Sequence, residues 1–459
     1  MRSPASAANS ASCKADPARD VSDGLTSALQ PLPVAPLVVG YSGGLDSTVL
    51  LHALAALPEA RTNGLRALHV HHGLHVDADE WATHCERVCA NLDIPLQVLR
   101  IVVNANGDGP EADARAARYS AFRDALIEGE VLALAQHRDD QAETILLRLL
   151  RGAGGDGLSA MRPHSTRNGL HLWRPLLDVP RADLRTYADA LSLRWVDDPS
   201  NADTQFDRNF LRQRVMPLLR ERWPHAAASL AGSAALLAEQ AELLQEEAAR
   251  RLAIIRNSDP HTLSVSKLLE QPRPCRARVL RHWLHELQLA PASRNILDAV
   301  ERELLSSRED AEARVAWSGT ELRRWRDALH AQPVRPPLPQ DLSIAWDGRA
   351  ALQLPGGDML ALDGTEAFDG PVEIRARQGG EQLRLPGRAH RHSLKHALQQ
   401  HDVAPWQRER LPLLFATDGE LLAAGNLLLS ARLESWLRER GATLRWLTTS
   451  APADTSSDD

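Results

Sequence analysis

Residues 34–222 predict an α/β domain built on a doubly wound parallel sheet, because short apolar runs alternate four times with helical patterns. Two further observations extend this prediction to the rest of the chain. An Ala/Leu/Glu-rich stretch predicts a helical middle domain over 223–335. Short strand-like runs with glycine turns predict a linker with short strands over 336–370, followed by a small α+β C-terminal domain over 371–449.

The elements of the first domain follow one another in alternation. Strands are expected at 36–42, 65–72, 96–103 and 130–137, and helices at 47–57, 77–92, 110–128 and 139–152. In a sheet of this kind, ligands bind beyond the carboxyl ends of the strands. Ser42, His71 and the turn from His137 to Asp140 fall at those ends, so we expect the functional site along that edge.

Both ends of the chain predict disorder. Residues 1–33 are rich in Ala, Ser, Pro and Asp and lack the basic region and apolar core of a secretory signal, and 450–459 form a second loose tail. Every apolar run is shorter than the roughly 20 residues that span a bilayer, so no membrane partner is expected. The four cysteines are too few and too scattered for a disulfide framework, which favours a cytoplasmic location.

The stretch "VVGYSGGLDS" (38–47) permits two interpretations. Gly40 to Gly44 fits G-x-S-x-G, the turn that exposes a nucleophilic serine in hydrolases. The same loop also fits a glycine-rich phosphate cradle at a helix N-terminus. The second interpretation is favoured, because the loop follows the first strand and a carboxylate and a hydroxyl start the helix. The expected nucleotide ligands are Ser42, Gly43, Gly44, Leu45, Asp46 and Ser47, with Asp46 also binding Mg²⁺.

This loop resembles the PP-loop of the N-type ATP pyrophosphatases, which split ATP between its α- and β-phosphates. Within that superfamily the chain is similar to the tRNA(Ile)-lysidine synthetases. The similarity rests on an ordered set of stretches: "HVHHGL" (69–74), "EADARAARY" (111–119), "HRDDQAETILLRLLRGAGGDGLSAM" (137–161), "WRPLL" (173–177), "DPSNADTQFDRNFLR" (198–212) and a C-terminal stretch over 379–425. Tyr41 stands where the family usually has a small residue.

The resemblance implies a two-step reaction. ATP with Mg²⁺ adenylates the 2-carbonyl oxygen of the wobble cytidine in the isoleucine tRNA with a CAU anticodon. Free L-lysine then attacks the activated carbon and expels AMP. The implied partners are this tRNA and free lysine, and a homodimer is also considered. The alternatives are a PP-loop tRNA thiolase, a serine hydrolase acting through Ser42, and a non-catalytic RNA-binding protein.

Arg115 and Arg118 lie on one face of the helix expected at 110–128, together with Glu111. Beside a phosphate cradle they suit the stabilisation of a charged α-phosphoryl transition state. An exposed Glu–Arg ladder would show the same spacing. We predict that both arginines are catalytic.

Carboxylates gather at the turn that follows the fourth strand. Asp139, Asp140 and Glu143 are expected at the start of a helix, where the helix dipole alone would stabilise them. With the resemblance, they are predicted to bind the cationic lysine. Asp139, or alternatively His137, would accept the proton that the amine loses.

The histidines of "HVHHGLH" (69–75) suggest a metal site only at first sight. On a strand His69 and His71 face one side and His72 the other, so the three cannot converge. Structural or nucleotide-pocket histidines are therefore favoured over a metal site, and His71 is assigned to the nucleotide pocket.

Two basic stretches are candidates for tRNA binding. The first contains Arg208, Asn209 and Arg212. The second is the densest basic block of the chain, with Trp406 as a stacking face, and its predicted RNA ligands are Arg384, Arg388, Arg391 and Lys395.

Overall fold

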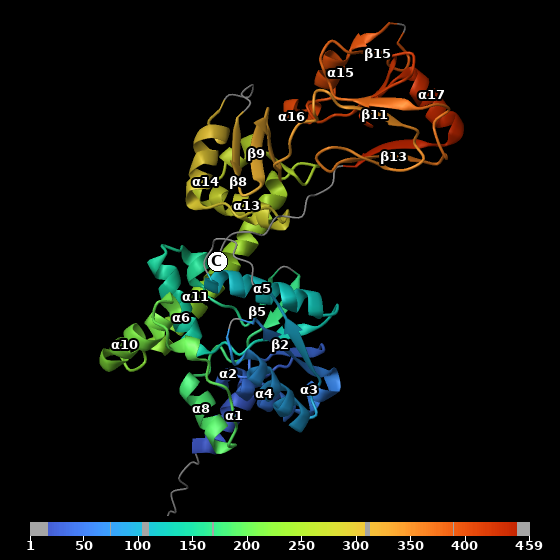
Figure 1. Ribbon diagram of the computed structural model, residues 1–459. Helices are drawn as coiled ribbons and strands as arrows, with labels where there is room; N and C mark the ends of the chain where they lie inside the picture. Colours follow the sequence, from blue (N-terminus) through green and yellow to red (C-terminus); the bar gives the residue numbers. More distant parts are fainter. Residues whose placement is uncertain are drawn as a thin grey trace, which may run out of the picture. The chain divides into compact units, whose positions relative to one another are not determined.

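The computed structural model describes residues 17–73, 75–102, 110–167, 169–307, 313–388 and 390–447. Two compact units divide the chain between Leu244 and Gln245. Figure 1 shows the α/β elements of the first unit in blue to green and the strand-rich second unit in yellow to red. Among the described residues, no helix combines the length and apolarity needed to cross a membrane.

The first unit is built on a sheet with the strand order β3-β2-β1-β4-β6-β5. All neighbouring strands are parallel except the edge pair β5 and β6. The predicted α/β class is confirmed, and so are its four expected strands. The strands are β1 (Leu37–Gly40), β2 (Leu65–His71), β3 (Leu96–Arg100), β4 (Val131–Ala133), β5 (His164–Arg167) and β6 (Leu170–Trp173).

Helices cover both faces of this sheet (Figure 1). Leu37 and Val39 of β1 pack into one core, whereas Val38 packs into the core on the other face with Tyr119. This alternation follows from the period of two in a strand. The helices are α1 (Pro17–Ala28), α2 (Leu45–Ala55), α3 (Pro58–Asn63), α4 (Ala78–Asn91), α5 (Pro110–Ala125), α6 (Arg138–Leu150), α7 (Gly155–Leu158), α8 (Arg181–Ala190), α9 (Asp207–Phe210) and α10 (Met216–Arg222), with the shorter turns η1 (Pro199–Ala202) and η2 (Leu211–Val215).

The N-terminal extension is shorter than the sequence suggested. Helix α1 occupies part of the predicted disordered segment, and its Leu25 and Leu29 are buried in the same core as β1 and α2. Val21, Leu25 and Leu29 recur every four residues, which forms an apolar stripe within a polar composition. Residues 1–16 and the predicted tail 450–459 lie outside the described residues.

The predicted helical middle domain also contains a sheet. Helix α11 (Ala226–Ile255) crosses the division between the units, and it is followed by α12 (Val265–Leu269), α13 (Arg273–Glu286), α14 (Arg294–Ala299) and η3 (Val300–Leu305). These helices pack on a four-stranded antiparallel sheet of β7 (Thr262–Ser264), β8 (Arg314–Trp317), β9 (Thr320–Trp325) and β10 (Ala328–Pro333). The middle region is therefore mixed rather than purely helical, because these strands bury their apolar side chains against the helices.

The segment predicted as a linker over 336–370 belongs to the C-terminal fold. Leu338, Leu354 and Leu360 are buried in one core with Val372 and Leu444. The strands are β11 (Ser343–Trp346), β12 (Leu352–Gln353), β13 (Met359–Asp363), β14 (Val372–Arg375), β15 (Gln382–Leu383), β16 (His392–Ser393), β17 (Leu413–Phe415), β18 (Leu421–Ala424), β19 (Leu428–Leu429) and β20 (Thr443–Leu447). The helices are α15 (Leu394–Gln400), α16 (Pro405–Arg408) and α17 (Ala431–Arg440).

Candidate active site

The loop between β1 and α2 is held by its own hydroxyl groups. Ser42 Oγ lies 3.0 Å from Ser47 Oγ and accepts a hydrogen bond from the Gly44 N–H at 3.3 Å, while Ser47 Oγ donates to the Gly44 carbonyl at 3.1 Å. Gly43 has φ +83°, and a Cβ there would meet Cys85 Sγ at 2.9 Å. The loop therefore requires glycine at this position. Its hydroxyls order a backbone cradle at the start of a helix.

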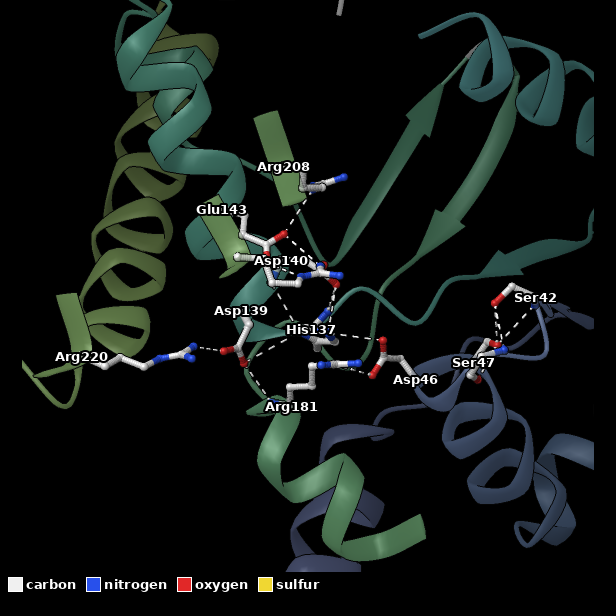
Figure 2. A network of polar contacts seen from close by, with 12 residues as sticks. Ser42, Asp46, Ser47, His137, Asp139, Asp140, Glu143, Arg181, Arg208 and Arg220 are labelled. Carbon is white, nitrogen blue, oxygen red and sulfur yellow. Dashed lines mark hydrogen bonds and ion pairs between the residues drawn. The ribbon is translucent and has the colours of Figure 1, made fainter. Parts of the chain in front are cut away.

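Asp46, in the first turn of α2, faces the end of β4. Its Oδ2 lies 3.5 Å from His137 Nε2, and its Oδ1 lies 3.6 Å from Arg181 Nε (Figure 2). Burial opposes ionisation of Asp46, but the hydrogen bond and charge of His137, together with Arg181 and Arg212, outweigh it and lower the pKa of Asp46. Asp46 Oδ1 is buried without a hydrogen-bond partner. A buried, ionised and under-satisfied carboxylate oxygen suits a hard cation.

His137 caps helix α6 and is fully buried. Its Nδ1 accepts from the Asp140 N–H at 3.4 Å, and Asp140 Oδ2 accepts from the His137 N–H at 3.1 Å. Burial disfavours the imidazolium, but Asp140, Asp46 and Asp139 outweigh it and raise the pKa of His137. The capping box thus fixes a histidine between three carboxylates.

The remaining carboxylates of α6 are paired with arginines (Figure 2). Arg212 donates to Glu143 at 2.7 and 3.0 Å and to Asp140 at 2.8 Å, and Arg208 lies 3.3 Å from Glu143. Burial disfavours a charged Arg212, but Glu143 and Asp140 outweigh it and raise its pKa. Asp139 accepts from the Arg181 N–H at 2.9 Å and pairs with Arg220.

Two predicted groups are arranged differently from the expectation. Arg208 and Arg212 turn toward the carboxylates of α6 rather than forming an open basic surface. Asn209 donates to the Ser200 and Asp203 carbonyls, both at 2.9 Å, so it orders its own loop. The placement is explained by the free energy of pairing buried carboxylates such as Glu143, which is 1 % exposed.

Two participants had no predicted role at these carboxylates. Arg181 of α8 contacts Asp46 and Arg220 of α10 contacts Asp139, and each arginine follows a motif of the sequence by a few residues. Helix α6 packs through Ala142 on Met216 near the start of α10, which brings Arg220 to Asp139. The sequence signal was limited to an arginine that follows the turn after "WRPLL".

His71, which was assigned to the nucleotide pocket, lies at the carboxyl edge of the sheet. His71 is buried at the end of β2, with its Nε2 3.2 Å from Asp79 Oδ1 and 3.4 Å from an Arg100 guanidinium nitrogen. His69 Nδ1 lies 3.0 Å from the Tyr41 carbonyl, directly before the loop. Within the part of the chain that the structure describes, no cluster of three or more His, Cys, Asp or Glu side chains is arranged to hold a metal.

The C-terminal basic residues are presented by a short hairpin and the helix after it. Arg384, Arg388, Arg391 and Lys395 are exposed around β15, β16 and α15. Trp406 does not provide the expected stacking face, because it is 4 % exposed and packs against the edge of His330 at 5.2 Å. An indole of this size contributes more to stability in a core than on the surface.

The parallel sheet, the glycine loop after its first strand and the carboxylates at its carboxyl edge define a PP-loop nucleotide-binding enzyme. Family models agree with this class. A PP-loop domain matches residues 17–219, a TilS substrate binding domain matches 263–330, and a TilS substrate C-terminal domain matches 372–446.

Curated relatives identify the family. The tRNA(Ile)-lysidine synthase of Xanthomonas campestris pv. campestris (strain 8004) is 50% identical over 425 residues, which is 92% of this chain and 97% of the relative. Those of Xylella fastidiosa (strain Temecula1) and Serratia proteamaculans (strain 568) are 48% and 42% identical, over 91% and 86% of this chain and 96% and 91% of the relatives. The chain belongs to the tRNA(Ile)-lysidine synthase family.

Solved structures match with lower sequence identity. The U34-tRNA thiolase NcsA from Methanococcus maripaludis is 17% identical, covers 48% of this chain and 78% of its own, and has a TM-score of 0.39. A structure of the TILS C-terminal domain is 19% identical, covers 23% and 98%, and has a TM-score of 0.20.

Proposed function

We propose that this chain attaches free L-lysine to the 2-carbon of the wobble cytidine in the isoleucine tRNA with a CAU anticodon, with ATP as the source of energy. The carbonyl oxygen at C2 attacks the α-phosphorus and pyrophosphate leaves. The lysine ε-amine then attacks C2, loses a proton and expels AMP. Two observations support this reaction: the membership of the lysidine synthase family, and the glycine loop whose Asp46 faces His137.

The phosphates of ATP are assigned to the loop from Ser42 to Ser47. Its N–H groups and the start of α2 favour an anion. Mg²⁺ would neutralise phosphate charge during adenylation, and Asp46 would hold it. The buried Oδ1 of Asp46, which accepts no hydrogen bond and lies 3.6 Å from Arg181 Nε, fits this assignment. Arg115 and Arg118 of α5 are assigned to the charge that develops on the α-phosphoryl group.

The lysine substrate is assigned to Asp139, Asp140 and Glu143. Arginines already neutralise these carboxylates, so an ammonium group must share or replace an arginine partner. Arg220 is 41% exposed, whereas Arg212 is 28% exposed, so the partner of Asp139 exchanges more readily. Asp139 is therefore proposed as the base that accepts the amine proton.

The cysteines argue against a thiolase. Burial raises the pKa of the Cys85 thiol to about 12 and that of Cys89 to about 11, so both remain protonated at neutral pH. Ser42 is engaged by its own loop rather than by a histidine base, which disfavours a hydrolase. We propose a cytoplasmic enzyme, and a homodimer is the oligomer to be tested by light scattering.

The test incubates the protein with ATP, Mg²⁺, L-lysine and the CAU transcript and measures modified nucleoside and AMP. Product formation must depend on both lysine and tRNA. A phosphonate probe that labels Ser42 without ATP would contradict the proposal and favour a hydrolase.

A further inference from the structure

Arginines from three segments surround Tyr119, which lies on α5. The Cζ atoms of Arg115 and Arg167 lie 5.6 and 4.9 Å from the centre of the Tyr119 ring. Burial disfavours ionisation of Tyr119, but the charges of Arg115, Arg174, which directly follows β6, and Arg118 outweigh it and lower the pKa of Tyr119. Because Tyr119 is itself buried, its ring orders the guanidinium groups and is covered by them.

The positive charge of this cluster is not balanced. Among the described residues, the structure pairs none of Arg115, Arg167 and Arg174 with a carboxylate, and the Nε atoms of Arg115 and Arg174 are buried without a hydrogen-bond partner. Burial lowers the pKa of Arg115, and the neighbouring Arg118, Arg208 and Arg167 lower it further. Buried cations without a counter-charge cost free energy that a bound anion would recover.

The ring of Tyr119 and the residue before the glycine loop, Tyr41, pack into cores on opposite faces of the sheet. Tyr119 packs with Val38, Leu68 and Leu132. Tyr41, which precedes the loop, packs with α2 and α4 on the opposite face. Arg174 Nη1 donates to the Arg162 carbonyl at 3.0 Å and to Ser165 Oγ at 2.9 Å, which leaves its Nε without a hydrogen-bond partner. Because the ATP phosphates already have a cradle at Ser42 to Ser47, this Nε and the Arg167 guanidinium are the donors assigned to another phosphate.

We infer that Arg167, Arg174 and Tyr119 form a second phosphate-binding site, and that its ligand is a backbone phosphate of the RNA next to the target cytidine. The identity of the RNA rests on the proposed function. Arg115 and Arg167 both contact the Tyr119 ring. This side chain therefore orders Arg115, which is assigned to the reacting phosphate of ATP, and Arg167, which is assigned to the RNA. Planar guanidinium groups suit phosphodiester oxygens in this role.

The test compares Arg167→Gln with a matched control, Arg185→Gln. Arg185 of α8 has its Cζ 4.7 Å from the centre of the Trp195 ring, so the control removes the same charge and the same kind of ring contact. Unlike Arg167, Arg185 also pairs with Asp189 of the same helix, at 3.0 Å. We measure the Kd of the CAU transcript across a salt series and the Kd of ATP without RNA. Arg167→Gln should raise the tRNA Kd about tenfold and reduce the slope of log K against log salt by about 0.7–0.9. ATP binding and the control should match the wild type.

A second variant checks the positioning role of Tyr119. Tyr119→Phe keeps the ring but removes the hydroxyl whose pKa Arg174 lowers, so the tRNA Kd should rise by about threefold, less than in Arg167→Gln. An unchanged tRNA Kd and salt slope in Arg167→Gln would overturn the inference. A raised ATP Kd with unchanged tRNA binding would overturn it too, because the phosphate would then belong to ATP. Wild-type protein that binds the transcript but makes no lysidine would instead contradict the proposed function and leave this site standing.

Discussion

The two edges of the parallel sheet both carry buried arginine–carboxylate pairs, but the pairs differ in completeness. At the amino edge, Arg66 donates to Glu130 at 2.7 and 2.6 Å and to the Ala125 carbonyl at 3.0 Å, and Glu130 also accepts from the Ile127 N–H. At the carboxyl edge, Asp46 Oδ1 and Arg208 Nε are buried without hydrogen-bond partners.

The amino edge therefore contributes to stability, and the carboxyl edge is the candidate for function. A closed pair such as Arg66 and Glu130 satisfies its own groups and stabilises the fold. The carboxyl edge leaves donors and acceptors under-satisfied beside the glycine loop, which has a cost in stability and is typical of a site that awaits a ligand. The variants below test how far the two edges differ.

The largest effect on activity is expected for Asp139→Asn. The amide cannot accept the lysine proton, so lysine transfer should slow by about 10²–10⁴-fold, while adenylation continues. The measurement is rapid quenching with separate detection of adenylated tRNA and lysidine. Adenylated tRNA should accumulate, and equal loss of both products would assign Asp139 to an earlier step.

Removal of the arginine from each edge should affect stability alike and activity differently. Arg66→Ala removes the arginine of Glu130, and Arg212→Ala removes the closest arginine of Glu143 and leaves Arg208 at 3.3 Å. Each buried carboxylate loses its closest cation, so the free energy of unfolding should fall by about 3–5 kcal/mol in urea titrations. Only Arg212→Ala should also slow lysidine formation, and by less than Asp139→Asn does. Adding Glu143→Gln to Arg212→Ala should recover stability without recovering activity, and a recovery of both would remove the distinction between the edges.

The contribution of the Arg66–Glu130 pair to the free energy of unfolding should depend on pH. Burial opposes ionisation of Glu130, but the hydrogen bond from Arg66, the Ile127 N–H and the Arg66 charge outweigh it and lower its pKa. The contribution is therefore complete above the unfolded pKa of about 4.3 and is lost as the pH falls through the folded pKa. The difference in unfolding free energy between wild type and Glu130→Gln should shrink below about pH 4.3. A difference that grows as the pH falls would contradict this prediction, because it would mean that folding raises the pKa of Glu130.

The smallest effect is expected for an exposed arginine away from both edges. Arg388→Gln should raise the Kd of the tRNA about two- to fivefold at moderate salt and leave the unfolding free energy within about 0.5 kcal/mol. Binding by filter retention and urea titration check both numbers. A large loss of stability would show that this residue, like Arg212, has a partner within the fold.

Local signals in the sequence predicted β1 to β4, the glycine loop and the carboxylates of α6, but not β5, β6 or the strands β7 to β10. The partners of those carboxylates could not be predicted, because Arg181 and Arg220 reach them only through the packing of α8 and α10. Helix α1 was missed because its stripe of Val21, Leu25 and Leu29 lies in a polar composition. Trp406 was misplaced for a related reason, since periodicity does not tell whether an aromatic side chain is covered by a neighbouring element.

The most direct test compares Asp46→Asn with Glu130→Gln, one carboxylate from each edge. Both variants replace an ionised carboxylate by an amide of the same shape, and the measurement is lysidine in the CAU transcript by nucleoside mass spectrometry, with AMP release in parallel. We predict wild-type activity for Glu130→Gln and a loss of about 10³-fold or more for Asp46→Asn, with both proteins folded. Activity in Asp46→Asn equal to that of Glu130→Gln would contradict the assignment of the carboxyl edge as the active site.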